Sequence, residues 1–227
     1  MKTLLMAGSA AIALAGVLAA PALAQTATAQ AAVPNNILLA EWTGPYDTVP
    51  PWDQVKPELF PQAFQFAIDE QRAEYQAIAN NPQAPTFANT IEAMEKAGRR
   101  LDRVQTLFGV MTDNMSTPAY EALDKEWSPK FSAASDEIRL NQKLFQRIET
   151  LYNNRASLGL DAKQTRLLTR TYEYFVRNGA KLNDAQKAEL SALNQKLSSA
   201  FSEFNSHLLK DEATFDVFVP NRKARKQ

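Results

Sequence analysis

Residues 183–208 read NDAQKAELSALNQKLSSAFSEFNSHL, and this stretch decides the fold class of the chain. Its large apolar residues recur at intervals of three and four, and they are Leu190, Leu193, Leu197, Phe201, Phe204 and Leu208. This spacing is typical of one face of an α-helix, so the stretch predicts a long amphipathic helix. Apolar side chains at helical spacing normally pack into a core, and we expect the same of this face.

The same helical period appears in five earlier segments, from Pro57 to about Asn80, from Thr86 to about Asp113, from Thr117 towards Leu140, after Asn141, and from Asp161 to Asn178. Thr86, Asn141 and Asp161 are residue types that cap helix N-termini. Gly98 lies inside the second segment and costs about 1 kcal/mol relative to alanine, which argues against one unbroken helix there. The sequence therefore predicts an all-α protein, an antiparallel bundle or lobe of about six helices.

The helical pattern is absent at both ends of this region. Residues 34–61 hold six prolines with Trp42, Tyr46 and Trp52 between them. Proline fixes φ and extends its predecessor, so we expect an extended arm that Trp42 and Trp52 pack over the helical body. Residues 214–219, TFDVFV, alternate and are β-branched or aromatic, which predicts a single strand-like segment. That segment either pairs with chain outside this sequence or lies as an extended tail.

The N-terminus has the features of an export signal. Lys2 precedes an apolar run from Leu4 to Ala20, and Ala22-Leu23-Ala24 gives a cleavage pattern before Gln25. The alternative is an uncleaved membrane anchor, but the run is just short of the ~20 residues that a spanning helix needs. We expect a periplasmic protein without a membrane segment after cleavage. The predicted organisation is a signal peptide over 1–24, a flexible N-terminus and arm over 25–55, a helical lobe over 56–213, and the strand-like segment with a basic tail over 214–227.

The composition excludes several classes of protein. The 227 residues include no cysteine and one histidine, with 25 basic and 25 acidic side chains. Disulfide-stapled folds, cysteine nucleophiles and metal sites that need two histidines are therefore impossible. The tail at 221–227, NRKARKQ, is strongly basic but short and lacks interleaved aromatic residues. We expect no nucleic-acid binding.

Few residues suggest a catalytic or metal site. Glu203 and His207 lie four apart and share a helix face, so they could begin a metal site or form an acid–base pair. Zinc needs three or four protein ligands, which favours a surface pair instead. The acidic pairs are interpreted as the solvated faces of helices, and they are Asp69-Glu70, Glu92/Glu95 and Asp211-Glu212.

An anion-binding role is conceivable for one arginine cluster, Arg99, Arg100 and Arg103. We interpret these side chains instead as surface charges that face Glu92, Glu95 and Asp102 at helical spacing. No set of residues combines a nucleophile, a base and an orienting group. The sequence therefore assigns no catalytic and no metal-binding residue, and it leaves the substrate-binding residues unknown.

Several segments together resemble the N-terminal region of the M3 family of zinc peptidases, in particular the bacterial peptidyl-dipeptidases (dipeptidyl carboxypeptidases). They are NILLAEWTGPY at 36–46, PPWDQVKPELFPQAF at 50–64, IANNPQAPTFANTIEAME at 78–95, SPK at 128–130, SLGL at 157–160, RLL at 166–168 and residues 172–179. The segment at 78–95 is the most distinctive. The resemblance spans residues 35–215.

The resemblance implies a mostly helical enzyme whose two lobes flank a deep channel for short peptides. Such enzymes remove dipeptides from peptide C-termini, with a zinc ion held by a His-Glu-x-x-His helix and a more distant glutamate. None of these positions exists in this sequence, so no catalytic or zinc-binding residue carries over to it. By resemblance, the chain is an N-terminal lobe that forms one wall of the channel and is inactive alone, and zinc and the catalytic lobe belong to the longer proteins.

Two hypotheses for function remain open at this point. Members of the family continue for several hundred residues beyond the segment at 214–219, which suggests premature termination near residue 218. The first hypothesis is therefore a truncated peptidyl-dipeptidase. The second is a short periplasmic helical protein that binds peptides or a partner without catalysis. An exposed apolar face on residues 183–208 would favour the first, and a cooperative melt of a soluble monomer would favour the second.

Overall fold

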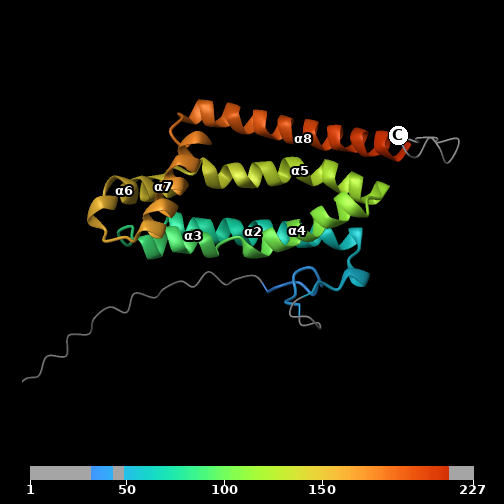
Figure 1. Ribbon diagram of the computed structural model, residues 1–227, viewed down its shortest axis with the longest axis horizontal. Helices are drawn as coiled ribbons and strands as arrows, with labels where there is room; N and C mark the ends of the chain where they lie inside the picture. Colours follow the sequence, from blue (N-terminus) through green and yellow to red (C-terminus); the bar gives the residue numbers. More distant parts are fainter. Residues whose placement is uncertain (1–31, 43–48, 215–227) are drawn as a thin grey trace, which may run out of the picture. The chain divides into compact units, whose positions relative to one another are not determined.

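The computed structural model describes residues 32–42 and 49–214 (Figure 1). The export signal, residues 215–219 of the predicted strand-like segment and the basic tail lie outside the described residues. Thr214, predicted as the first residue of that segment, instead ends the last helix. Within them every regular element is helical, which confirms the all-α prediction. The main helices are α2 (Phe60–Ala79), α3 (Ala93–Lys96), α4 (Arg99–Asn114), α5 (Pro118–Arg139), α6 (Gln142–Asn153), α7 (Ala162–Arg177) and α8 (Asp184–Thr214). Shorter helical turns are η1 (Trp52–Gln54), η2 (Pro57–Leu59), η3 (Phe87–Glu92) and η4 (Arg155–Ser157).

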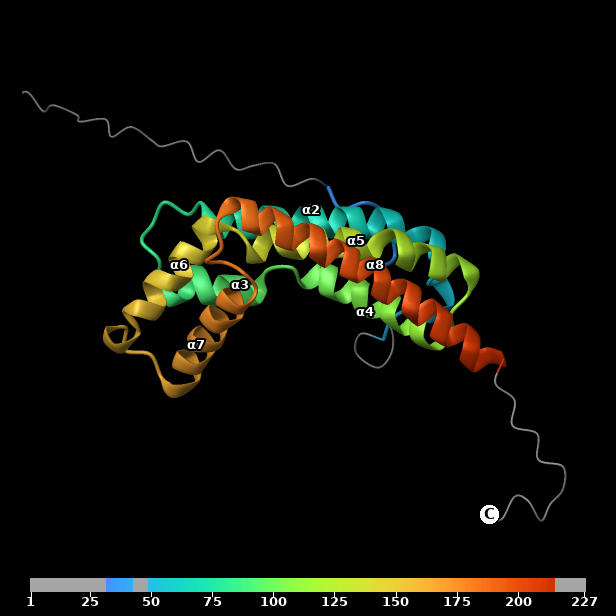
Figure 2. The ribbon, with the colours of Figure 1, turned by 90° about the horizontal axis from the view of Figure 1, so that it is seen from above.

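The helices of this body are arranged in layers (Figures 1 and 2). Helix α2 packs against α4, and α5 packs on both of them. Helix α8 runs along α5 on the side away from α2 and α4. Helices α6 and α7 pack against each other and against η3 at one end of the bundle. Helix α8 is therefore an outer layer that rests mainly on α5.

A cluster of aromatic rings fills the space between α2, α4 and α5. Phe64 lies at its centre, with ring centroids 5.3 Å from Phe60, 5.1 Å from Phe108, 5.2 Å from Trp127 and 4.8 Å from Phe131. Edge-to-face aromatic pairs contribute stability beyond the area that they bury. Phe60, Phe64 and Phe108 lie in segments whose apolar period predicts helices, and they are buried as such a period predicts. Trp127 and Phe131 are added to the cluster by α5.

A second core joins η3, α6 and α7. Its buried residues include Ile91, Leu144, Phe145, Ile148, Leu151, Leu168 and Phe175. The loop before η3 is fixed by Arg147 of α6, whose guanidinium donates to the carbonyls of Asn81 and Gln83, each at 3.0 Å, and to Oδ1 of Asn89 at 2.9 Å. This loop is part of the most distinctive resembling segment, residues 78–95. The buried side chain of Arg147 helps to hold its conformation with these three hydrogen bonds.

The helix predicted over residues 86–113 is divided at Gly98. This residue has φ = +77°, a conformation that strains any residue with a Cβ atom. A Cβ built on it would lie 2.5 Å from Nε2 of Gln71, and its N–H donates to Glu74 Oε2 at 2.7 Å. The chain therefore turns between α3 and α4, where glycine permits both the left-handed conformation and the close approach of α2.

The N-terminal arm is held by fewer aromatic contacts than predicted. Trp42 packs on the core that contains the aromatic cluster. Trp52 is 40% exposed, so the expectation that Trp52 packs over the body is wrong. Leu38 and Leu39 are buried instead. Asn36 donates to the carbonyl of Leu59 at 2.9 Å and accepts from the N–H of Leu38 at 3.0 Å, which anchors the arm to the start of α2.

Candidate functional site

A cleft of about 490 Å³ opens between α2, α3, α5 and α7. Three guanidinium groups line it, from Arg139, Arg170 and Arg177, and we call it the arginine cleft. Its other polar lining includes Glu95, Glu173, Tyr75 and Tyr174, and its apolar lining includes Met94, Ile138 and Phe175. Pockets of this size with a few convergent polar groups are typical of small-ligand sites.

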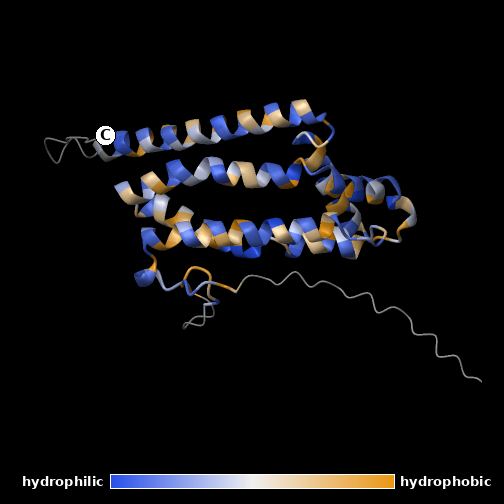
Figure 3. Cartoon of the chain, turned by 180° about the vertical axis from the view of Figure 1, so that it is seen from behind, coloured by the Kyte–Doolittle hydropathy of each residue, from blue (hydrophilic) through white to orange (hydrophobic). Residues whose placement is uncertain are grey.

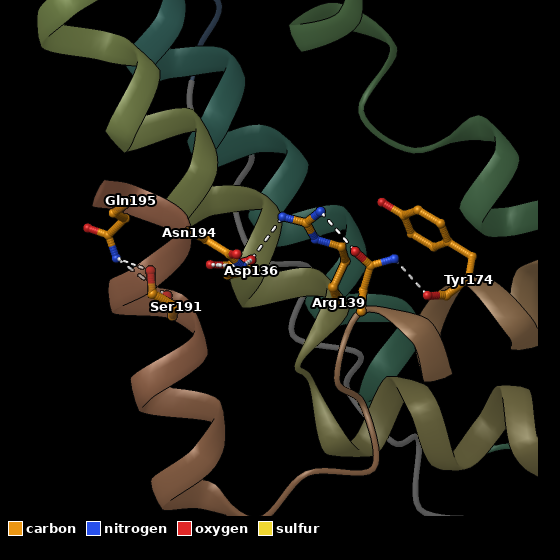
Figure 4. Close-up of polar contacts among 7 residues, drawn as sticks. Asp136, Arg139, Tyr174, Ser191, Asn194 and Gln195 are labelled. Carbon is orange, nitrogen blue, oxygen red and sulfur yellow. Dashed lines mark hydrogen bonds and ion pairs between the residues drawn. The ribbon is translucent and has the colours of Figure 1, made fainter. Parts of the chain in front are cut away.

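Arg139 is fixed by a polar network at the end of α5 (Figure 4). Its Nη2 donates to Asp136 Oδ1 at 2.8 Å, and its Nη1 donates to Asn178 Oδ1 at 3.4 Å. Asn178 in turn donates to the carbonyl of Tyr174 at 2.8 Å. The Nε of Arg139 is buried without a hydrogen-bond partner among the described residues. Arg139 therefore positions the C-terminal end of α7, which forms one side of the cleft.

Two other side chains in the cleft, the guanidinium of Arg170 and the phenol of Tyr75, are available to a ligand. Arg170 makes no ion pair within the described part of the chain, whereas Arg177 lies 3.7 Å from Glu173. Burial, aided by the negative charges of Asp102, Glu95 and Glu74, raises the pKa of Tyr75 to about 12. Tyr75 can donate a hydrogen bond near neutral pH as any tyrosine can, and the raised pKa extends this protonated state into the alkaline range.

The charged groups of the cleft suit a ligand that carries both signs of charge. Guanidinium groups bind carboxylates with two parallel hydrogen bonds, and Glu95 and Glu173 can accept from an amine or amide. Both signs of charge thus line one cavity. The described lining contains no histidine or cysteine that could serve as a nucleophile or a general base near neutral pH.

Polar groups also form the contact between α5 and α8, which we call the α5–α8 seam. Asp136 is only 3% exposed and accepts from the side-chain amide of Asn194. Asp124 accepts from the hydroxyl of Ser202, and Glu121 accepts from that of Ser206 at 3.2 Å. Buried polar groups need such partners, because an unpaired one costs about 1–3 kcal/mol. Hydrogen bonds are therefore the main specific contacts between α8 and α5.

The apolar face predicted on α8 points away from this seam. Leu193, Leu197, Phe201, Phe204 and Leu208 are between 44% and 61% exposed, and we call this row the α8 stripe. In Figure 3 hydrophobic and hydrophilic positions alternate along α8. The expectation that this face packs into the core is therefore wrong for these five residues, whereas Leu190, the first of the predicted row, is half-buried next to Gly179. The helix itself is confirmed. The inward face is built from serine and asparagine, and its polar residues repeat at helical spacing as well.

The predicted pair of Glu203 and His207 lies on exposed turns of α8. In the described ranges no group of three His, Cys, Asp or Glu side chains could hold a metal ion. Zinc sites need three or four such ligands, so the donor set present here does not fit zinc. Asp211 and Glu212 are exposed near the end of α8.

The other charged candidates are mostly paired between elements. Asp69 pairs with Arg72 of the same helix, and Glu70 of α2 pairs with Arg100 of α4 at 2.9 Å. Arg103 donates to the carbonyl of Leu39 at 2.8 Å and lies over the ring of Trp42. The expectation that Arg99, Arg100 and Arg103 face Glu92, Glu95 and Asp102 is therefore wrong for Arg100 and Arg103, because α2 and the arm supply their partners. Arg99 is exposed.

Among the candidates from the sequence, the cleft includes only Glu95. Arg139, Arg170, Arg177 and Tyr75 were missed, because α2, α5 and α7 bring them together only in the folded chain. The sequence does contain a pattern that indicates the α8 face of the α5–α8 seam. Small polar residues recur there at intervals of three and four, and they are Ser191, Asn194, Ser198, Ser202 and Ser206. Such a stripe of small polar residues indicates a helix face that contacts another polar face.

The fold and the cleft together define an all-helical lobe that carries a cleft lined by side chains of both charge signs. Comparison with models of known protein families gives no match. Within residues 32–42 and 49–214, none of the helices combines the length and the apolar character that crossing a bilayer requires.

Sequence comparison with individual proteins is more specific. Over 174 residues, 77% of its length, the chain is 38% identical to the dipeptidyl carboxypeptidase of Escherichia coli (strain K12). Over 175 residues it is 37% identical to the dipeptidyl carboxypeptidase of Salmonella typhimurium (strain LT2). These stretches cover 25% and 26% of the two proteins, so the chain spans about a quarter of the length of the curated relatives it matches. The resemblance is confirmed: the chain is homologous to dipeptidyl carboxypeptidases, and the match supports its assignment to their N-terminal region.

Proposed function

We propose that this chain is the N-terminal helical lobe of a periplasmic zinc peptidyl-dipeptidase of the M3 family and forms one wall of the channel that admits short peptides. The identity of 38% to a dipeptidyl carboxypeptidase over 77% of the chain carries this proposal. The all-helical architecture agrees with it. The enzymes of this class release dipeptides from the C-terminal ends of their substrates.

In this proposal the lobe binds and orients peptides and supplies no zinc ligand. Within residues 32–42 and 49–214 the histidine and the carboxylates form no group of three that could hold zinc, and the proposal assigns cleavage to the remainder of the enzyme. The arginine cleft is the binding surface that the lobe offers. Arg170 is free to hold a carboxylate, and Glu95 and Tyr75 offer an acceptor and a donor to the peptide backbone.

The periplasmic location rests on the export signal predicted over residues 1–24. Expression of the complete chain in a Gram-negative host, followed by osmotic release and N-terminal sequencing, tests it. We expect the protein in the periplasmic fraction with Gln25 as its first residue. A protein that stays in the cytoplasm with Lys2 retained contradicts this part of the proposal.

The function is tested by a chimera in which this chain replaces the matching quarter of the Escherichia coli dipeptidyl carboxypeptidase. We expect the zinc-loaded chimera to release dipeptides from a short peptide, whereas the chain alone with added zinc releases none. A matched chimera with Arg170→Gln shows whether the cleft contributes, and we expect a higher KM for it.

Two outcomes contradict the proposal. A folded, zinc-loaded chimera without peptidase activity shows that the chain does not serve as this lobe. Robust dipeptide release by the chain alone shows that it contains catalytic groups. Tight binding of peptides by the chain alone, together with an inactive chimera, supports the rival function of a non-catalytic binding protein.

A further inference from the structure

Helix α8 presents opposite characters to its two sides. At 100° per residue, the α8 stripe is centred roughly 130° around the helix from the serines that face α5. The seam side carries Asn194, Ser202 and Ser206, and Ser202 is only 7% exposed. The outward side carries three leucines and two phenylalanines, each more than two fifths exposed. An ordinary surface helix has these two sides the other way round.

The seam explains why α8 does not turn its apolar side inward. Rotation of the stripe towards α5 would separate Asp136 from Asn194 and Asp124 from Ser202. The carboxylates would then face leucine and phenylalanine side chains without donors. Burial of unpaired charges costs more than the stripe would gain, so the observed orientation is the stable one. The stripe is therefore outward because of the neighbouring carboxylates on α5.

The size of the stripe indicates a surface for a partner. From Leu193 to Leu208 it extends for about 22 Å at 1.5 Å per residue. Contiguous apolar patches of this kind on soluble proteins mark interaction sites. On the helical projection His207 lies beside the stripe, as a polar rim residue of a protein interface does, whereas Glu203 lies about 120° from the stripe centre.

We infer that the α8 stripe is the surface on which the remaining part of a dipeptidyl carboxypeptidase chain packs, through an apolar face of its own. This inference rests on the proposed function. Three quarters of each matched relative have no counterpart in the aligned residues, so the enzyme holds a large polypeptide that must contact this lobe. The stripe is the longest row of exposed large apolar residues on the described helices.

The test compares two variants in the chimera and in the chain alone. The first, Leu197→Ser with Phe204→Ser, changes the stripe. The second, Lys196→Ser with Glu203→Ser, is the matched control, because it places two serines on the same exposed turns and leaves the net charge unchanged. Thermal melting is measured for all proteins, and dipeptide release is measured for the chimeras.

We expect the stripe variant to lower the melting temperature of the chimera and to reduce dipeptide release roughly tenfold or more, with little effect from the control. In the chain alone, neither variant should lower the melting temperature, because the stripe is exposed there. A stripe variant whose chimera melts and reacts like the control overturns the inference. A chain that sediments as a dimer, with the dimer lost in the stripe variant, also overturns it, because a second copy then covers the stripe.

Failure of the proposed function gives a different result. If the parent chimera folds but releases no dipeptides, the proposed function fails. The melting comparison still decides the inference in that case, since a stripe covered by the remaining chain makes the chimera sensitive to Leu197→Ser with Phe204→Ser. Equal melting of both variants then contradicts the docking surface itself.

Discussion

The side-chain amide of Asn194 on α8 donates to the carboxylate of Asp136 on α5, with Nδ2 3.0 and 3.2 Å from its two oxygens. Asp136 also pairs with Arg139 at 2.8 Å and is almost completely buried. Replacement of Asp136 by alanine leaves both donors without an acceptor. We expect Asp136→Ala to lower the free energy of unfolding by about 2–4 kcal/mol. Urea unfolding followed by circular dichroism measures this, and Asn194→Ala should cost less, about 1 kcal/mol. Equal stability of Asp136→Ala and the wild type would contradict the described network.

The aromatic cluster makes a second prediction. Phe64 is fully buried and contacts four other aromatic rings. Phe64→Ala should therefore lower the free energy of unfolding by about 3–5 kcal/mol, as large-to-small changes in cores do. Phe201→Ala is the control, because Phe201 is 59% exposed on α8, and it should change stability by no more than about 0.5 kcal/mol in the chain alone. Similar losses for both variants would show that Phe201 is buried in solution.

Two glycines of the same region should respond in opposite directions. Gly98→Ala places a Cβ in a left-handed conformation and against Gln71, so it should destabilise the chain by about 1–3 kcal/mol. Gly109 lies inside α4 with open space around its Cβ position. Gly109→Ala should stabilise the chain by about 0.5–1 kcal/mol, because alanine favours helix. Chemical denaturation of both variants tests the pair, and a stabilising Gly98→Ala would rule out the turn between α3 and α4.

Tyr75 gives the chain a pH dependence at the alkaline end. Its pKa is raised to about 12 in the folded chain, from an ordinary value near 10. Between these values the unfolded chain loses the Tyr75 proton while the folded chain retains it, so stability falls as the pH rises from about 10 to about 12. Tyr75→Phe removes this contribution and should make the decline shallower. Urea midpoints across this range measure the slope, and an unchanged slope would contradict the burial of the phenol.

The sequence predicted the helices well because their signals are local. Caps at Thr86, Asn141 and Asp161 are present in the structure, and the side chains of all three accept the expected backbone N–H. Phe64, Leu144 and Leu168, which lie in three of the predicted helical segments, are buried. The segment from Thr86 to about Asp113 is interrupted at Gly98, as the glycine indicated, and the geometry of the turn depends on the contact of Gly98 with α2.

The cleft and the orientation of α8 could not be predicted in the same way. Arg139, Arg170 and Tyr75 come from three helices, and no spacing in the sequence relates them. For α8 the helical period was predicted correctly, but the predicted burial of the α8 stripe was wrong. Which face of a helix is buried depends on the side chains that the neighbouring helix presents to it. Acidic side chains on α5 occupy the side that α8 contacts, and this information lies 58 to 85 residues away in the sequence.

The α5–α8 seam also sets the rotational register of a long helix. Hydrophobic contacts tolerate a helix that rolls or slides slightly, whereas hydrogen bonds from Asn194 and Ser202 to two fixed carboxylates do not. Polar contacts of this kind contribute little net stability, and their clearest use is to select one arrangement among several. Because Asp136 and Asp124 lie three turns of α5 apart, they fix both the roll and the axial position of α8. The direction in which its leucines and phenylalanines point is thus specified by two aspartates on another helix.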